Sequence, residues 1–165
     1  MPSFDDVLAA NAAYGTTYVD AGMPGKAARG LAVITCMDSR INPLGMLGLS
    51  TGDAKILRNA GARVTDDVLR TLVFATQLLD VNRVIVVAHT DCGMTKATDE
   101  QVHAEMLRRG LDTRSLEFRT IAHQVSTLAD DVQRIRSSPY LPADLAVMGC
   151  VFDVHTGLLD VVVEP

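Results

Sequence analysis

The stretch LAVITCMDSR at residues 31–40 joins an apolar segment to three reactive side chains. Its first five residues lack the polar alternation of a half-exposed strand, so we predict a strand buried on both faces, as parallel strands covered by helices are. A thiol, a carboxylate and a guanidinium follow at alternate positions, as Cys36, Asp38 and Arg40. If the extended conformation continues, alternate residues point the same way and these groups face one cleft.

A second apolar segment, RVIVVA at residues 83–88, ends in HTDC at residues 89–92. In open α/β sheets, ligands bind beyond the carboxyl ends of strands at the point where the strand order reverses. A strand order of 2-1-3-4 places this segment beside the strand at 31–36, with the reversal between them. The two strand ends are therefore expected to share one site.

The other apolar segments predict alternating strands and helices, which is typical of a mostly parallel sheet. The HTG turn at 155–157 predicts a hairpin, so the last strand is expected to be antiparallel. We therefore predict an α/β fold with a mostly parallel four-stranded sheet, an antiparallel C-terminal edge strand and helices on both faces. The predicted strands are 31–36, 54–58, 83–88, 145–151 and 158–163, and the predicted helices are 4–20, 65–80, 100–109 and 114–136.

Composition limits the possible classes of protein. The 165 residues, 48% of them hydrophobic, predict a single domain over residues 1–165, with residues 1–29 as an N-terminal helical arm. A formal net charge of −5 and an aromatic content of 4% argue against nucleic-acid binding, which needs a basic surface and stacking side chains. No segment approaches the roughly 20 apolar residues that span a bilayer. The N-terminus has no basic region of the secretory kind, so we expect a cytoplasmic protein with reduced thiols.

Cys36, His89 and Cys92 match the ligand set expected of a catalytic zinc site, in which three side chains bind the ion and a fourth position stays open. Two thiolates neutralise the divalent charge, so this zinc is expected to activate water less strongly than one held by three histidines. Asp38 could accept a hydrogen bond from water on the metal or occupy the fourth position itself. Arg40 can hold that carboxylate through its planar fork, so an open state and an Asp38-closed state are both predicted.

Four motifs resemble those of the β-class carbonic anhydrases, and together they cover most of the chain from Leu31 onward. The pattern Cys-x-Asp-x-Arg combined with His-x-x-Cys-Gly is more specific than His-x-x-Cys alone. The motifs are CMDSR at 36–40, RNAG at 58–61, HTDCG at 89–93 and DVHTGLL at 153–159.

This resemblance implies that Zn2+ binds to Cys36, His89 and Cys92, and that Asp38 and Arg40 form a catalytic dyad. It implies the reversible hydration of carbon dioxide to bicarbonate and a proton, through zinc-bound hydroxide. It also implies a homodimer or a dimer of dimers, with each active site near a subunit interface.

Some members of this family close the site with the aspartate on zinc and bind bicarbonate in a pocket built on a tryptophan and an arginine. Val33 stands at the position of that tryptophan, whereas Arg58 fits the arginine. The resemblance therefore favours an open site in this chain. Plant-like members contact substrate through a glutamine that has no counterpart before residue 31, so we expect substrate contacts at Gly93, Ala60 and Gly61.

Two other functions stay open at this point. The same zinc site could hydrolyse carbonyl sulfide or carbon disulfide, because enzymes with those activities resemble this family and the motifs do not separate them. The chain could also be a zinc-binding sensor without turnover, although the retention of Asp38 and Arg40 argues against that. Cys150 lies inside an apolar strand and is expected in the core.

Overall fold

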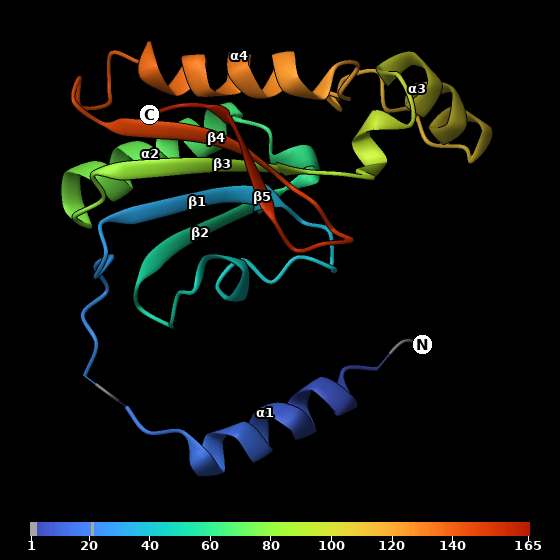
Figure 1. The fold of residues 1–165 in the computed structure, drawn as a ribbon. Helices are drawn as coiled ribbons and strands as arrows, with labels where there is room; N and C mark the ends of the chain where they lie inside the picture. Colours follow the sequence, from blue (N-terminus) through green and yellow to red (C-terminus); the bar gives the residue numbers. More distant parts are fainter. Residues whose placement is uncertain (1–2, 21) are drawn as a thin grey trace.

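The computed structural model describes residues 3–20 and 22–165, and its centre is a five-stranded sheet in the order β2-β1-β3-β4-β5 (Figure 1). Strands β1 to β4 are parallel and β5 pairs antiparallel with β4, as the sequence predicted. Because β1 pairs with β3, the carboxyl ends of the two strands meet at one edge of the sheet. The strands are β1 (Leu31–Cys36), β2 (Ala54–Asn59), β3 (Arg83–His89), β4 (Ala146–Phe152) and β5 (Leu159–Val163).

Local capping sets where two of the helices begin. Thr65 Oγ1 accepts a hydrogen bond from the N–H of Val68 at 3.4 Å, so the predicted cap of α2 is confirmed. Thr98 and Gln101 form a capping box at the start of α3. No helix within the described ranges is long and apolar enough to cross a membrane. The α-helices are α1 (Asp5–Thr17), α2 (Asp66–Leu78), α3 (Asp99–Arg108) and α4 (Gln124–Arg136), and the 3-10 helices are η1 (Gly45–Leu47), η2 (Ala60–Ala62) and η3 (Gly93–Thr95).

One face of the sheet is covered by α2 and α4. Ile34 and Val86 are fully buried there and belong to the same cluster as Leu72 of α2 and Val132 of α4. Gly149 lets α4 approach β4 closely, since a Cβ at this position would lie 3.0 Å from Val132 Cγ2. This face is the main apolar core of the molecule.

The other face of the sheet is covered by η1 and the segment around it. Val33 and Val87, both fully buried, pack there in a cluster that includes Ile41. Helices were expected on both faces, and on this one the helix is a single 3-10 turn. Pro43 and the left-handed Gly48, at φ 61°, prevent a longer helix in this connection.

The helix predicted over residues 114–136 is wrong in its first part, because α4 begins at Gln124. The preceding segment is a loop that is tied down by a carboxylate of α3. Asp99 accepts hydrogen bonds from the N–H groups of Arg119 and Thr120 at 3.1 and 2.8 Å, and Arg119 has a left-handed φ of 57°. Ile121 therefore belongs to this loop and not to a helix face. Its side chain is buried, and its N–H donates to Met94 O at 2.8 Å.

Helix α1 lies apart from the sheet, and none of its residues is buried (Figure 1). The helix predicted over residues 4–20 is confirmed over Asp5–Thr17. Residues 1, 2 and 21 of the predicted N-terminal arm lie outside the described residues. Several large apolar side chains of this arm are exposed, namely Phe4, Val7, Leu8, Tyr14 and Tyr18.

Candidate metal centre

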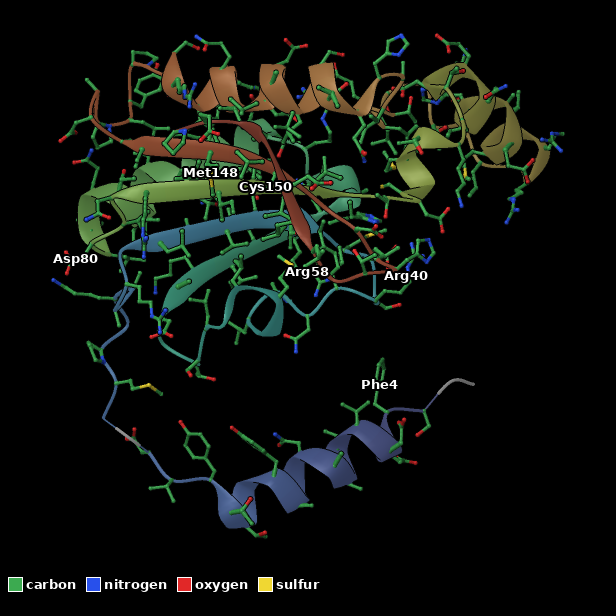
Figure 2. All side chains as sticks on the ribbon, in the orientation of Figure 1. Phe4, Arg40, Arg58, Asp80, Met148 and Cys150 are labelled. Carbon is green, nitrogen blue, oxygen red and sulfur yellow. The ribbon has the colours of Figure 1, made fainter. Side chains whose placement is uncertain are left out.

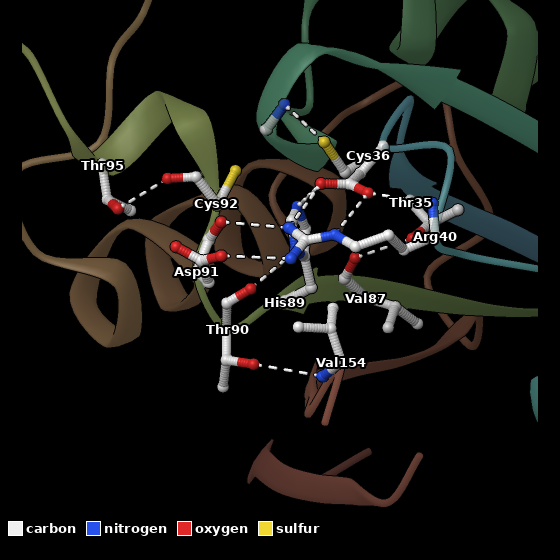
Figure 3. A network of polar contacts seen from close by, with 12 residues as sticks. Thr35, Cys36, Arg40, Val87, His89, Thr90, Asp91, Cys92, Thr95 and Val154 are labelled. Carbon is white, nitrogen blue, oxygen red and sulfur yellow. Dashed lines mark hydrogen bonds and ion pairs between the residues drawn. The ribbon is translucent and has the colours of Figure 1, made fainter. Parts of the chain in front are cut away.

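Three potential ligands meet at the carboxyl ends of β1 and β3 (Figure 3). Cys36 ends β1, His89 ends β3, and Cys92 follows His89 in the next turn. One ligand atom from each residue can be chosen so that all three lie within 4.8 Å of one another. The three residues are buried, with exposed fractions of 5%, 1% and 2% in the same order. The structure therefore brings the predicted ligands together in one buried cluster.

His89 is oriented to bind an ion through Nε2. Its Nδ1 lies 2.8 Å from the carbonyl oxygen of Thr90, which can only accept, so Nδ1 carries the ring proton and Nε2 carries the lone pair. Within residues 3–20 and 22–165, Nε2 is the one buried side-chain nitrogen or oxygen without a hydrogen-bond partner. An orphaned buried acceptor beside two thiols fits a thiophilic divalent ion such as zinc.

The two thiols influence each other and the backbone around them. A hydrogen bond with Cys92 lowers the pKa of Cys36 below its usual range, with help from the N–H of Gly61 and against the effect of burial. The same pairing, together with burial, raises the pKa of Cys92. The N–H of Gly61, which has a left-handed φ of 80°, lies 3.3 Å from Cys36 Sγ. A divalent ion between the sulfurs would hold both as thiolates.

Asp38 and Arg40 form a bidentate ion pair beside this cluster. Arg40 Nε donates to Asp38 Oδ1 at 3.0 Å, and Nη2 donates to Oδ2 at 2.8 Å. These hydrogen bonds, with a further one from the Arg40 N–H, hold the pKa of Asp38 well below its usual range. Asp38 Oδ2 lies 3.9 Å from His89 Nε2. The carboxylate therefore borders the ligand cluster while Arg40 holds both of its oxygens.

The extended conformation that we assumed beyond Cys36 is wrong, because the chain turns there. The N–H of Ile41 donates to Asp38 O at 3.1 Å, which closes the turn and places Arg40 against Asp38. Arg58 holds the turn from β2, since its Nε donates to Cys36 O at 3.0 Å and its Nη2 to Asp38 O at 2.7 Å. Arg58, which matches the arginine of the bicarbonate pocket in sequence, thus donates to two backbone carbonyls in this structure.

Asp91 is a site residue that the motif spacing alone does not reveal. Its Oδ2 accepts a hydrogen bond from Arg40 Nη1 at 3.0 Å, and its Oδ1 pairs with Lys96 Nζ at 2.7 Å. Lys96 and Arg40 hold the pKa of Asp91 below its usual range. The sequence signal that could have found it is its place between two predicted ligands, His89 and Cys92.

Contacts from α4 and from the β4–β5 turn fix the end of β3. Gln124 Nε2 donates to His89 O at 2.7 Å, and no feature of the sequence pointed to this contact. The N–H of Thr90 donates to Phe152 O at 2.9 Å, and the N–H of Val154 donates to Thr90 Oγ1 at 3.1 Å. Val154 of the DVHTGLL motif thus supports the segment that carries two potential ligands.

The other sequence predictions for this region concern substrate contacts and the third cysteine. Ala60 and Gly61 lie in η2, and the Gly61 N–H contacts Cys36 Sγ. Gly93 begins η3 and directly follows Cys92 in the chain. Cys150 is 1% exposed in β4 and packs in the apolar cluster that also contains Cys36 and Cys92, as predicted.

Comparison with known proteins identifies the family. The family model for carbonic anhydrase matches residues 31–133, which include all three potential ligands. Beta-carbonic anhydrase 1 of Mycobacterium tuberculosis is 33% identical over 156 residues, which cover 94% of this chain and 95% of the relative. The chain belongs to the β-class carbonic anhydrases.

Solved structures of the family share this fold. A crystal structure of carbonic anhydrase from Streptococcus mutans superposes with a TM-score of 0.92 at 37% identity, covering 98% of each chain. A carbon disulfide hydrolase of an Acidianus species is also similar, at 32% identity over 78% of this chain and 74% of the relative. Relatives of this β-class carbonic anhydrase thus carry the names of two different activities.

Proposed function

We propose that this chain catalyses the reversible hydration of carbon dioxide to bicarbonate and a proton, with Zn2+ held by Cys36, His89 and Cys92. The observation that carries the proposal is the buried Nε2 of His89, which has no hydrogen-bond partner. It lies 3.9 Å from Oδ2 of Asp38, the carboxylate that Arg40 holds. A structural zinc site would contain a fourth cysteine or histidine, whereas the cluster found among the described residues has three members.

When bound, zinc supplies a Lewis acid that lowers the pKa of water and makes a nucleophile available near neutral pH. Asp38 is ionised there, because Arg40 holds its pKa well below the usual range. It can therefore accept a hydrogen bond from the nucleophile and orient the free lone pair toward the carbon atom of carbon dioxide. Arg40 keeps the carboxylate in that orientation, and the released proton passes to buffer.

The orientation of Asp38 supports an open site, since both of its oxygens accept hydrogen bonds from Arg40. Val33, where the bicarbonate-closed members have a tryptophan, is a fully buried core residue. Substrate contacts at Ala60, Gly61 and Gly93 remain predictions. Of these, the Gly61 N–H already donates to Cys36 Sγ, which leaves the Gly93 amide as the better candidate donor.

The second candidate function is the hydrolysis of carbon disulfide on the same metal. It is supported by the similarity to the Acidianus carbon disulfide hydrolase. Two water molecules would convert carbon disulfide to carbon dioxide and two molecules of hydrogen sulfide. Sulfide release from carbon disulfide, measured beside carbon dioxide hydration with the same zinc-loaded sample, separates the two activities.

A homodimer or a dimer of dimers in the cytoplasm also belongs to this proposal. The exposed apolar residues of α1 support association, because a helix without any buried residue has no packing partner within one copy. The three cysteines, all free and buried, fit a reducing compartment. Analytical ultracentrifugation tests the assembly, and a monomer at micromolar concentration would contradict it.

The enzymatic proposal is tested by stopped-flow measurement of carbon dioxide hydration with the purified zinc-loaded protein. Assays at about pH 7 and about pH 8.5 cover the range in which zinc-activated water ionises, allowing for the weaker activation expected with two thiolates. We expect a rate above buffer at the higher pH at least. The absence of catalysis at both values, with zinc present in stoichiometric amount, would contradict the proposal.

A further inference from the structure

Arg40 is held from two sides by groups of two different segments (Figure 3). On one side it donates to both carboxylate oxygens of Asp38, its neighbour in the same turn. On the other side Nη1 donates to Asp91 Oδ2 at 3.0 Å and Nη2 donates to Asp91 O at 3.2 Å. Asp91 therefore links the turn after β1 to the ligand segment after β3.

Asp91 has partners on both carboxylate oxygens, although its side chain is 44% exposed. It lies between His89 and Cys92, which are almost fully buried, and its backbone is left-handed at φ 53°. Lys96 Nζ holds its second oxygen, Oδ1, at 2.7 Å. The side chain is thus placed by the segment that carries two of the three potential ligands, and not by the turn that carries the dyad.

We propose that Asp91 is a positioning residue that anchors Arg40 and so keeps Asp38 off the metal. Asp38 and Arg40 are two residues apart on one turn, so the pair can move together unless a group outside that turn holds it. Asp38 Oδ2 is 3.9 Å from His89 Nε2, so a small movement suffices to bring the carboxylate to the fourth metal position. This inference rests on the proposed metal site.

The size of the effect follows from the share of molecules in the open state. A ligand that binds only the open state has an apparent Kd equal to its intrinsic Kd divided by the open fraction. If loss of the anchor lets Asp38 occupy the metal in about nine molecules of ten, the affinity for a small anion falls about tenfold. The apparent Kd of a small anion therefore reports how often Asp38 occupies the metal, without any assay of catalysis.

Asp80 provides a matched control at the opposite end of the sheet (Figure 2). Like Asp91 it has a left-handed backbone, at φ 60°, and its side chain pairs with a lysine, Lys26, at 2.9 Å. Asparagine tolerates this conformation, so Asp80→Asn and Asp91→Asn make the same chemical change. Only Asp91→Asn removes a negative charge that faces Arg40, and with it the charge-assisted part of the Nη1 hydrogen bond.

The experiment is a titration of cobalt-substituted protein with azide, followed by the visible absorption of the metal. We expect Asp91→Asn to raise the apparent Kd of azide about tenfold relative to wild type. Asp80→Asn is expected to leave it unchanged. Asp91→Gly, which suits the left-handed backbone and also lacks the carboxylate, is expected to behave like Asp91→Asn.

The double variant Asp38→Ala/Asp91→Asn shows whether the effect acts through Asp38. It is expected to bind azide as tightly as Asp38→Ala alone, because no carboxylate remains to compete. An unchanged Kd in both single Asp91 variants, or an equal loss of affinity in the Asp38→Ala background, would overturn the inference. Failure of the wild type to take up cobalt would instead contradict the metal site, and the inference with it.

Discussion

The ends of β1 and β3 lie side by side but are built differently. After β1 the chain leaves the sheet at once, and Asp38 and Arg40 sit in a turn with side chains 19% and 42% exposed. After β3 the chain stays bound to the sheet and to α4 through Thr90 and Gln124, and its two potential ligands, His89 and Cys92, are almost fully buried. The end of β3 thus carries two of the three proposed ligands in a segment that is held firmly, whereas the turn after β1 carries groups whose position can change.

The largest expected effect is the loss of zinc when a proposed ligand after β3 is removed. Cys92→Ala removes one of the three proposed ligands, so we expect loss of stoichiometric zinc, as measured by atomic absorption after dialysis. Cys150→Ala is the matched control, since it removes a buried thiol from the same apolar cluster and should leave the zinc content unchanged. Full zinc occupancy in the Cys92 variant would show that the ligand is assigned wrongly.

A substitution in the turn after β1 should have the opposite effect, so that the protein keeps the metal and loses activity. Asp38→Ala removes the group that orients the nucleophile, and we expect the hydration rate to fall by about two to three orders of magnitude. Zinc content is expected to match wild type, because Asp38 is not one of the three ligands. Turnover within a factor of two of wild type would show that the dyad has no role in catalysis.

An intermediate effect is expected where β2 holds the turn after β1. Arg58→Met removes the hydrogen bonds to Cys36 O and Asp38 O, and contacts of this supporting kind typically change activity by about 10- to 100-fold. Arg83→Met is the control, because Arg83 also donates twice to a backbone carbonyl, that of Arg29, at the start of β3. Equal stopped-flow rates for the two variants would argue against a positioning role for Arg58.

The smallest effect on the site is expected from the loop that precedes α4. Asp99→Ala removes a carboxylate that accepts hydrogen bonds from Thr120 and Arg119, which should lower the free energy of unfolding by about 1–2 kcal/mol at neutral pH. Those bonds, that of the Thr120 side chain first, lower the pKa of Asp99 in the folded state. The stabilisation is therefore present above about pH 4 and is lost as the pH falls through the folded-state value.

Denaturant unfolding of wild type and Asp99→Ala at neutral and acidic pH measures this difference. Asp130→Ala, at an exposed position of α4, is the control variant. A difference between Asp99→Ala and wild type that persists unchanged at about pH 2.5 would contradict the role of the ionised carboxylate.

Only part of the site can be predicted from the sequence. The three potential ligands follow from the rule that parallel strands present their carboxyl ends at one edge of the sheet, and from apolar segments that show where β1 and β3 end. The resemblance of the motifs then assigned a role to Asp38 and Arg40. These predictions depend on element order and residue type, which the sequence displays directly.

Other features depend on contacts between distant segments, and the sequence does not display these. The turn after Cys36 is set by hydrogen bonds of Asp38 and by Arg58, which comes from another strand. The segment before α4 has apolar residues at helical spacing, but it forms a loop because Asp99 accepts hydrogen bonds from its backbone. Asp91 gains its contact with Arg40 only when the two strand ends are brought together.

Anomalous diffraction at the zinc absorption edge tests whether the ends of β1 and β3 share one zinc ion. Crystals of the zinc-loaded protein are expected to show one peak about 2.3 Å from the sulfurs of Cys36 and Cys92 and about 2.0–2.1 Å from His89 Nε2. A peak at any other place, or none at all with zinc present in the solution, would show that the two strand ends do not bind zinc together.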